Sequence, residues 1–192
     1  MSIDNLKKKI ERYQPYNEQE EGDKQLILEY MNDFDNILTR DNKYTHFTAS
    51  SFIVNKERTK MMVIHHNQFK AYTIPGGHAD GESDLLGTAI REAKEETGIE
   101  NIVPVDNDIF SLEVFAIHGH MKNGKWVSSH THLNLLYIFE ADETEKIRIQ
   151  EDENSDVKWV NIDNVAELHI GDWTRKYYIN KAIDKLKEQY ID

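Results

Sequence analysis

The chain contains no cysteine, which excludes disulfide bonds, zinc–thiolate sites and a cysteine nucleophile. No run of about 18 apolar residues occurs, so we expect no transmembrane helix and no membrane partner. Residues 1–9 lack the apolar stretch of a secretory signal, and the chain has no internal repeat or low-complexity linker. These absences together predict a protein of the reducing cytoplasm.

Positive charge is scarce, because 35 acidic residues against 23 basic ones give a formal net charge of −12 at pH 7. Non-specific binding to a polynucleotide depends on clustered Lys and Arg, so we expect no polynucleotide partner. Much of this charge simply keeps the protein dissolved. A small anionic substrate remains compatible with it, provided that metal ions and a few local cations face the phosphates.

The first 42 residues predict a helical extension. Ile3, Leu6 and Ile10 share one helix face, and apolar residues at 26–34 form a second, less regular face. Pro15 and the polar residues 17–23 separate the two helices. The extension has three candidate uses, which are packing on the main domain, covering a cleft or forming a dimer contact, and we favour packing.

After residue 42 the pattern changes to short strands. We expect strands at residues 46–54, 60–65, 69–74, 109–118, 132–140 and 157–160. The first two strands are joined by a polar hairpin-like loop, and Asn123-Gly124 is a further turn signal. We expect residues 75–77 to form a glycine turn that leads into a helix.

Helices accompany these strands. One is predicted at residues 84–97, with Gly98 at the position that commonly ends a helix. A short helix starts at residues 161–163, and an amphipathic helix with Tyr177 on its packing face covers residues 173–190. Residues 43–192 therefore predict an α/β (α+β) sandwich, in which helices cover both sides of a mixed sheet.

Three glutamates gather on one face of the helix at 84–97. Glu92 and Glu96 are four residues apart and Glu95 is three after Glu92, so all three are neighbours at 3.6 residues per turn. Like charges at this spacing destabilise an isolated helix, and a divalent cation is the simplest way to offset them. Mg²⁺ and Mn²⁺ prefer such oxygen ligands. The alternative is a solvated acidic helix with a glycine cap.

This stretch resembles the Nudix box, whose pattern is Gly-x₅-Glu-x₇-Arg-Glu-aliphatic-x-Glu-Glu-x-Gly-aliphatic. The matching positions are Gly77, Arg91, Glu92, Ala93, Glu95, Glu96, Gly98 and Ile99. One position departs from the pattern, because the first Glu of the box is Ser83 here. A shift of one residue in the loop would bring Glu82 into that role.

The resemblance implies a Nudix-type αβα sandwich and a site for Mg²⁺ or Mn²⁺. Its expected metal ligands are the Gly76 carbonyl with Glu92, Glu95 and Glu96. The same three glutamates and Glu153 are the candidate catalytic residues. The general base stays open between a box glutamate and a glutamate of the later acidic loop, Glu151 or Glu153. The resemblance also gives Arg91 a structural role, as the partner of Glu82 or Asp84.

The candidate substrate-binding residues are His78, Arg91, Lys122 and His132. His118 and His120 alternate along one strand, as do His130 and His132, and such spacing allows a zinc site. We favour substrate contact for these histidines over zinc. Five aromatic residues are candidates either for stacking on a nucleobase or for the core: Tyr72, Phe115, Trp126, Trp159 and Trp173.

The sequence therefore predicts a metal-dependent hydrolase acting on a small nucleotide derivative. It would cleave the diphosphate linkage of a nucleoside diphosphate joined to another moiety, as in a nucleoside triphosphate or ADP-ribose. The alternative is a non-catalytic Nudix-fold sensor or protein-interaction module, against which the three intact glutamates speak. An isomerase of this fold is disfavoured because the chain lacks cysteine. A homodimer is compatible with the resemblance, since dimers are common in the family.

Overall fold

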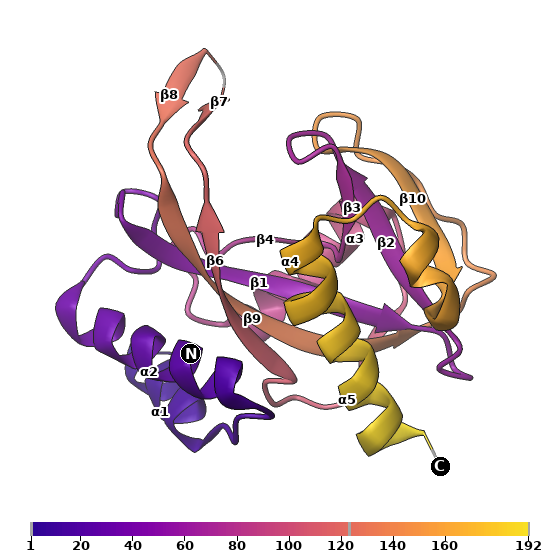
Figure 1. Cartoon of the computed structure of the whole chain (residues 1–192), viewed down its shortest axis with the longest axis horizontal. Helices are drawn as coiled ribbons and strands as arrows, with labels where there is room; N and C mark the ends of the chain where they lie inside the picture. The colour runs from indigo at the N-terminus through magenta and orange to yellow at the C-terminus, as the bar shows by residue number, and fades with distance from the viewer. Residues whose placement is uncertain (1, 123, 192) are drawn as a thin grey trace.

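The computed structural model describes residues 2–122 and 124–191 (Figure 1). In this part of the chain, eight strands form a mixed sheet in the order β10-β2-β1-β9-β5, with β3 on β2, β4 on β1 and β6 on β9. The strands are β1 (Thr45–Val54), β2 (Lys60–His66), β3 (Ala71–Thr73), β4 (Gly76–His78), β5 (Ile102–Pro104), β6 (Ser111–Ile117), β9 (His130–Ala141) and β10 (Asn154–Asn161). The predicted mixed sheet between helices is confirmed.

The sheet is built around the parallel pair of β1 and β9. Their register runs from Thr45 opposite Thr131 to Val54 opposite Glu140. Every residue of β1 is buried, as is typical of a central strand covered on both faces. Because side chains alternate along a strand, residues 46, 48, 50 and 52 face one side and residues 47, 49, 51 and 53 face the other.

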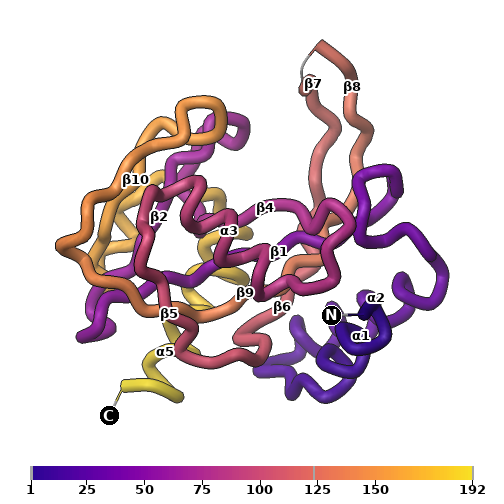
Figure 2. The backbone as a smooth tube through the Cα atoms, turned by 180° about the vertical axis from the view of Figure 1, so that it is seen from behind, coloured from indigo at the N-terminus to yellow at the C-terminus, as the bar shows by residue number. Residues whose placement is uncertain are grey.

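Helix α3 (Leu85–Thr97) covers the face that carries Phe47 and Ala49. Helices α1 (Ile3–Arg12) and α2 (Glu18–Asp33) pack into the same core, beside β6 (Figure 2). Their apolar residues Leu6, Ile10 and Ile27 are almost completely buried there. The predicted packing of the N-terminal helices is therefore confirmed, and these helices are part of one continuous core.

The opposite face is covered by the C-terminal segments. They are η1 (Ile162–Glu167), α4 (Asp172–Thr174), η2 (Arg175–Asn180) and α5 (Lys181–Tyr190). The segment η2 is a π-helical turn, which rotates the following side chains relative to a regular α-helix. As a result Tyr178 is buried, whereas Tyr177, predicted on the packing face, is only half-buried.

A buried charged network joins the first and last helices. Lys181 of α5 lies 3.0 Å from both Glu20 of α2 and Glu113 of β6. Lys185 donates to the hydroxyl of Tyr13, which in turn donates to Glu20 over 2.6 Å. Burial by itself raises the pKa of Glu20, but the charges of Lys181 and Lys185, together with hydrogen bonds from Tyr13 and Tyr16, keep it below its usual value.

The predicted glycine turn at residues 75–77 was wrong. Gly76 and Gly77 do not form a turn; they lie in β4, which pairs with β1 through Ser50. The turn comes later, at Asp80 (φ 47°) and Gly81 (φ 96°). The predicted turn at residues 123–124 includes Asn123, which lies outside the described residues.

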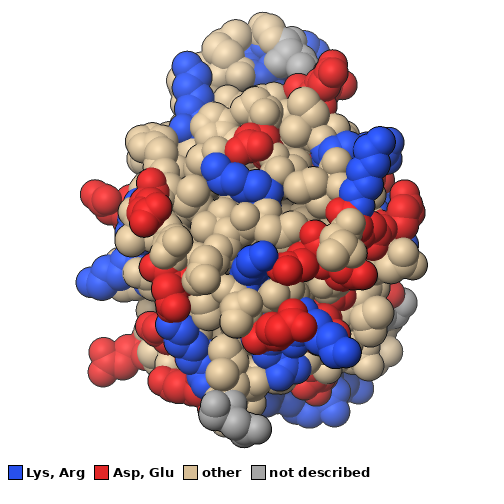
Figure 3. Space-filling view, turned by 90° about the vertical axis from the view of Figure 1, so that its right-hand side faces the viewer, with Lys and Arg blue, Asp and Glu red and all other residues tan. Residues whose placement is uncertain are grey.

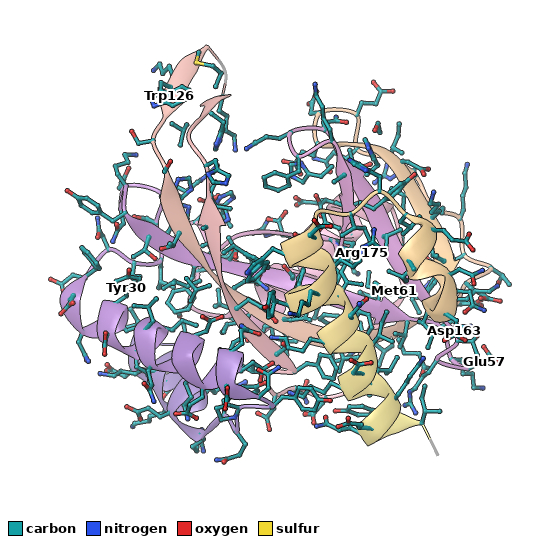
Figure 4. All side chains as sticks on the ribbon, viewed as in Figure 1. Tyr30, Glu57, Met61, Trp126, Asp163 and Arg175 are labelled. Atoms are coloured by element: carbon teal, nitrogen blue, oxygen red, sulfur yellow. The ribbon has the colours of Figure 1, made fainter. Side chains whose placement is uncertain are left out.

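The remaining strands, β7 (His120–Lys122) and β8 (Lys125–Val127), form a separate hairpin that projects from the main sheet (Figure 1). Near its tip, Trp126 is 66% exposed (Figure 4), so this side chain is not part of the hydrophobic core on either face of the sheet. In the part of the chain that the structure describes, no helix is both long and apolar enough to cross a bilayer.

Candidate active site

Helix α3 presents the three glutamates in its last two turns. Gly98 adopts a left-handed conformation (φ 74°) after the helix, and its N–H donates to the carbonyl of Lys94. This is the predicted helix end, and the predicted start differs by one residue. Glu96 is buried, Glu92 is partly buried and Glu95 is exposed.

Strand β4 lies directly against this acidic face. The backbone N–H of Gly76 donates to Oε2 of Glu96 over 2.7 Å. A Cβ atom at Gly77 would lie 2.2 Å from Cδ of Glu92, and one at Gly76 would lie 2.5 Å from Oγ of Ser50. The two glycines are therefore required for close approach and not for a special backbone conformation.

The carboxylates of the site repel one another, and burial adds to the cost of their charge. Burial raises the pKa of Glu96 well above its usual value, and the nearby charges of Glu153 and Glu92 raise it further. Burial also raises the pKa of Glu92, although the neighbouring guanidinium of Arg91 partly offsets this. The acidic loop before β10 reaches the helix, because the side-chain amide of Asn154, the residue after Glu153, donates to the backbone carbonyl of Glu96 over 2.9 Å.

Arg91 pairs within its own helix. It donates to Oε1 of Glu92 over 2.7 Å and lies 3.6 Å from Glu95. Burial lowers the pKa of Arg91, but Glu92 and, at longer range, Glu82 raise it by more. The close partner predicted in the loop, Glu82 or Asp84, is thus replaced by Glu92. Glu82 instead accepts a hydrogen bond from the hydroxyl of Thr88 in the first turn of the helix.

The donor set fits a hard divalent cation. Among the described residues, the ion pairs of the acidic face all involve Arg91, and none involves Glu96. Buried carboxylates without a neutralising partner are costly, and carboxylate and carbonyl oxygens are the ligands that Mg²⁺ and Mn²⁺ take. Glu92, Glu95, Glu96 and the Gly76 carbonyl can supply such oxygens.

On the face of β1 opposite α3, the sheet carries a buried polar strip that we did not predict from the sequence. Asn134 accepts hydrogen bonds from the hydroxyls of Thr48 (3.1 Å) and Ser50 (2.8 Å). Its amide nitrogen donates to Glu113 over 2.9 Å. The available signal was the alternation of the polar residues His46, Thr48 and Ser50 with the apolar residues Phe47 and Ala49.

The predicted substrate contacts His78 and His132 lie together at one end of this strip. Their ring centroids are 4.9 Å apart, and each also packs against His46, which sequence reasoning missed. Burial, with smaller effects of neighbouring histidines and of the charge of Lys122, lowers the pKa values of His78 and His132. Lys122 itself is exposed on β7. Arg91 lies apart from this group, on the acidic helix.

The aromatic candidates separate into different roles. Phe115 packs edge-on against Trp173, with ring centroids 5.3 Å apart, and Trp173 is 41% exposed. Trp159 packs against the core, and the hydroxyl of Tyr72 donates to Asp156 over 2.7 Å. Phe115 and Trp173 are therefore the candidates for stacking on a base.

A cavity of about 390 Å³ lies away from these residues, between α1, the start of β6 and α5, and is lined by Lys9, Tyr13 and Tyr190 among others. The acidic face of α3 has no part in it. On the side of the molecule shown in Figure 3, basic and acidic side chains are interspersed and form no basic patch.

The sandwich, the glycine strand and the acidic helix define a Nudix-type hydrolase domain. The NUDIX domain family matches residues 45–181, and the chain therefore belongs to the Nudix family. It is a Nudix pyrophosphohydrolase by class. A similar curated protein is an RNA pyrophosphohydrolase of Pelagibacter ubique (strain HTCC1062), 27% identical over 126 residues, which are 64% of this chain and 78% of the relative.

Solved structures show the same fold. A C. elegans Ap4A hydrolase is 15% identical, with a TM-score of 0.51 over 74% of this chain and 95% of its own. A MutT protein from Methanosarcina mazei Go1 is 16% identical, with a TM-score of 0.53 over 76% of this chain and 98% of its own. At these identities the likeness concerns the fold alone.

Proposed function

We propose that this protein is a Mg²⁺- or Mn²⁺-dependent hydrolase that cleaves the diphosphate linkage of a small nucleotide derivative. The observation that carries the proposal is the pair Glu92 and Glu96, held against Gly77 and Gly76 with raised pKa values. Carboxylates kept together in this way suit a cation and the phosphates that it binds. Residues 43–192 form the catalytic domain in this proposal, and residues 1–42 are an extension that shares its core.

The chain's own residues have distinct proposed roles. Glu92, Glu95, Glu96 and the Gly76 carbonyl are the metal ligands. A divalent ion bound there neutralises phosphate charge and lowers the pKa of a bound water. The Gly76 N–H orients the carboxylate of Glu96, and Arg91 orients that of Glu92.

Glu153 is the proposed general base. It lies on an exposed loop, and the next residue, Asn154, donates from its side-chain amide to the backbone carbonyl of Glu96 over 2.9 Å, which supports a position of Glu153 beside the proposed metal ligands. In the proposed step, water attacks a phosphorus atom of the diphosphate, the bridging P–O bond breaks, and the water proton passes to the Glu153 carboxylate. A box glutamate remains the alternative base.

The substrate is proposed to lie across the polar face of the sheet. Lys122 and His78 are the proposed phosphate contacts. Arg91 is the proposed substrate contact nearest the metal ligands. Phe115 and Trp173 would stack on a base. The names of the relatives add two candidate substrates, a pyrophosphorylated RNA end and a dinucleoside polyphosphate. We favour a small nucleotide, because the chain carries a net charge of −12.

The test is product release from a substrate panel, measured with Mg²⁺, with Mn²⁺ and with EDTA. The panel contains nucleoside triphosphates, ADP-ribose, dinucleoside polyphosphates and a triphosphorylated RNA oligonucleotide. We expect metal-dependent cleavage of a small nucleotide that falls at least about 100-fold in Glu92→Gln and in Glu96→Gln. The matched control is Glu100→Gln, an exposed position just beyond the helix, which should retain wild-type turnover.

Two results would reject the proposal. Turnover that persists in EDTA, or near wild-type turnover in both variants, removes the metal assignment. Saturable nucleotide binding without turnover of any substrate favours the sensor alternative. Cleavage restricted to the RNA oligonucleotide would keep the reaction and replace the substrate class.

A further inference from the structure

Three histidines converge at the start of the central strand pair. His46 belongs to β1, and His130 and His132 belong to β9, where His46 stands opposite His132 in the register. One ring nitrogen from each residue can be chosen so that all three lie within 4.8 Å of one another. The Nε2 atoms of His130 and His132 are 3.0 Å apart. We call His46, His130 and His132 the histidine cluster.

Backbone carbonyls fix the tautomers of two of these rings. Nδ1 of His46 lies 3.1 Å from the carbonyl oxygen of Asn42, and Nδ1 of His130 lies 2.8 Å from that of Ser128. A carbonyl oxygen can only accept, so each Nδ1 carries the proton and each neutral ring keeps a lone pair on Nε2. This is the arrangement of metal-binding histidines, which donate their other N–H to a carbonyl or carboxylate.

His46 has an unsatisfied nitrogen. Its side chain is almost fully buried, with 5% of the residue exposed, and Nε2 has no hydrogen-bond partner among the described residues. Buried polar atoms are paired in the large majority of cases, so this lone pair is available to an ordered water or to a metal ion. A metal ion bound between the three rings would satisfy it.

The cluster is unsuited to binding an anion directly. With the proton on Nδ1, His46 and His130 each keep a lone pair on Nε2, and this nitrogen cannot donate a hydrogen bond. A phosphate needs hydrogen-bond donors or positive charge facing it, whereas a metal ion needs lone pairs.

We propose that His46, His130 and His132 bind a divalent transition-metal ion of the zinc type, at a site separate from the carboxylates of α3. Imidazole nitrogens suit zinc, copper and nickel, whereas magnesium prefers oxygen ligands. Nitrogens on a tetrahedral zinc ion lie about 3.4 Å apart, so the rings need to move by on the order of 1 Å.

Three protein ligands leave the fourth tetrahedral position for water or a substrate oxygen. In this arrangement His132, predicted as a direct substrate contact, would contact the substrate through the ion. His78 flanks the site, with its ring 5.2 Å from that of His46.

The test uses the full-length protein without an affinity tag, stripped of metal with EDTA and exchanged into EDTA-free buffer. Zn²⁺ binding is measured by calorimetry, and Co²⁺ binding by the visible absorption that reports nitrogen ligation in tetrahedral geometry. Both titrations are run with excess Mg²⁺, which occupies the proposed carboxylate site on α3, and we expect one further site per chain for each ion. His130→Ala and His132→Ala should each weaken binding at least about tenfold, since removing even supporting residues of a metal site costs that much.

Two controls separate this site from its surroundings. His118→Ala and His120→Ala remove histidines of the same region from outside the cluster and should leave binding unchanged. The double variant Glu92→Gln/Glu96→Gln should also bind Zn²⁺ normally, so the result does not depend on the proposed hydrolase activity. Thermal unfolding without metal checks that each variant is folded. Because His130 is only partly buried, His130→Asn replaces the alanine variant if the latter unfolds.

The proposal is overturned if the wild type shows no saturable binding of Zn²⁺ or Co²⁺. It is also overturned if folded variants of His130 and His132 bind as tightly as the wild type. Loss of binding in the double glutamate variant, with the histidine variants unaffected, would assign the ion to α3 instead.

Discussion

The backbone N–H of Gly76 and the carboxylate of Glu96 are joined by a 2.7 Å hydrogen bond that ties β4 to the acidic face of α3. This contact holds the most deeply buried of the three glutamates in one orientation. The neighbouring glycine, Gly77, allows Glu92 the same close approach. The position of the proposed metal ligands thus depends on two residues that have no side chain.

Gly77→Ala should reduce turnover by about 100-fold, because a displacement of about 1 Å can cost this much. The new Cβ would lie 2.2 Å from Cδ of Glu92, so the carboxylate must move. The measurement is kcat on the best substrate of the panel, with the melting temperature checked in parallel. A folded variant with wild-type kcat would show that Glu92 need not occupy its present position.

Gly22→Ala should stabilise the protein by about 0.5–1 kcal/mol. Gly22 lies inside α2, is exposed, and would have no atom within 4 Å of an added Cβ, so only the helix propensity changes. Urea unfolding measures the change, and turnover should equal that of the wild type. A lower free energy of unfolding would contradict the helical assignment at this position.

Glu20→Gln should lower the free energy of unfolding by about 3 kcal/mol, because it removes one charge of a buried ion pair and leaves the other charge buried. Glu20 lies 3.0 Å from Lys181 and also accepts hydrogen bonds from Tyr13 and from the N–H of Tyr16. The matched control is Glu21→Gln, an exposed neighbour, which should change stability by less than about 0.5 kcal/mol. Equal unfolding midpoints for the two variants would refute the proposed importance of the network.

His66→Gln should remove part of the acid sensitivity of the fold. Burial, with smaller effects of Lys122 and His65, lowers the pKa of His66 from 6.5 to about 4. Between these two values the unfolded chain binds the proton more readily, so stability falls as the pH decreases from 6.5 towards 4. The stabilising contribution of the neutral ring is fully present above this range.

Urea midpoints measured across this pH range test the prediction. The wild type should lose stability more steeply than His66→Gln as the pH falls, and the two curves should run parallel above about pH 7. Parallel curves at every pH would show that His66 titrates alike in the folded and unfolded chains.

The sequence predicted those parts of the fold that depend on local patterns. The helix at residues 84–97 was found almost to the residue, because its apolar spacing and Gly98 are read within a single segment. Strand β4 was expected to be a turn, since Gly76 and Gly77 favour turns by themselves. Its strand pairing comes from β1, a partner that is distant in sequence.

The site was predictable to a similar degree. The three glutamates share a helix face, so their proximity follows from their spacing alone. His46 was missed because only the register of β1 with β9 brings it beside His132. The prediction of the partner of Arg91 was wrong for a related reason. The choice between Glu82 and Glu92 depends on where the loop lies, and Glu82 is engaged with Thr88.

The contact between Tyr13 and Lys185 spans 172 positions of the chain. During synthesis the first helices leave the ribosome long before the last one, and until then Glu20 lacks its cationic partners. The packing of the N-terminal helices is therefore incomplete until α5 is present. The buried network can form only after α5 has been synthesised, so we expect the docking of α5 against the N-terminal helices to be a late step of folding.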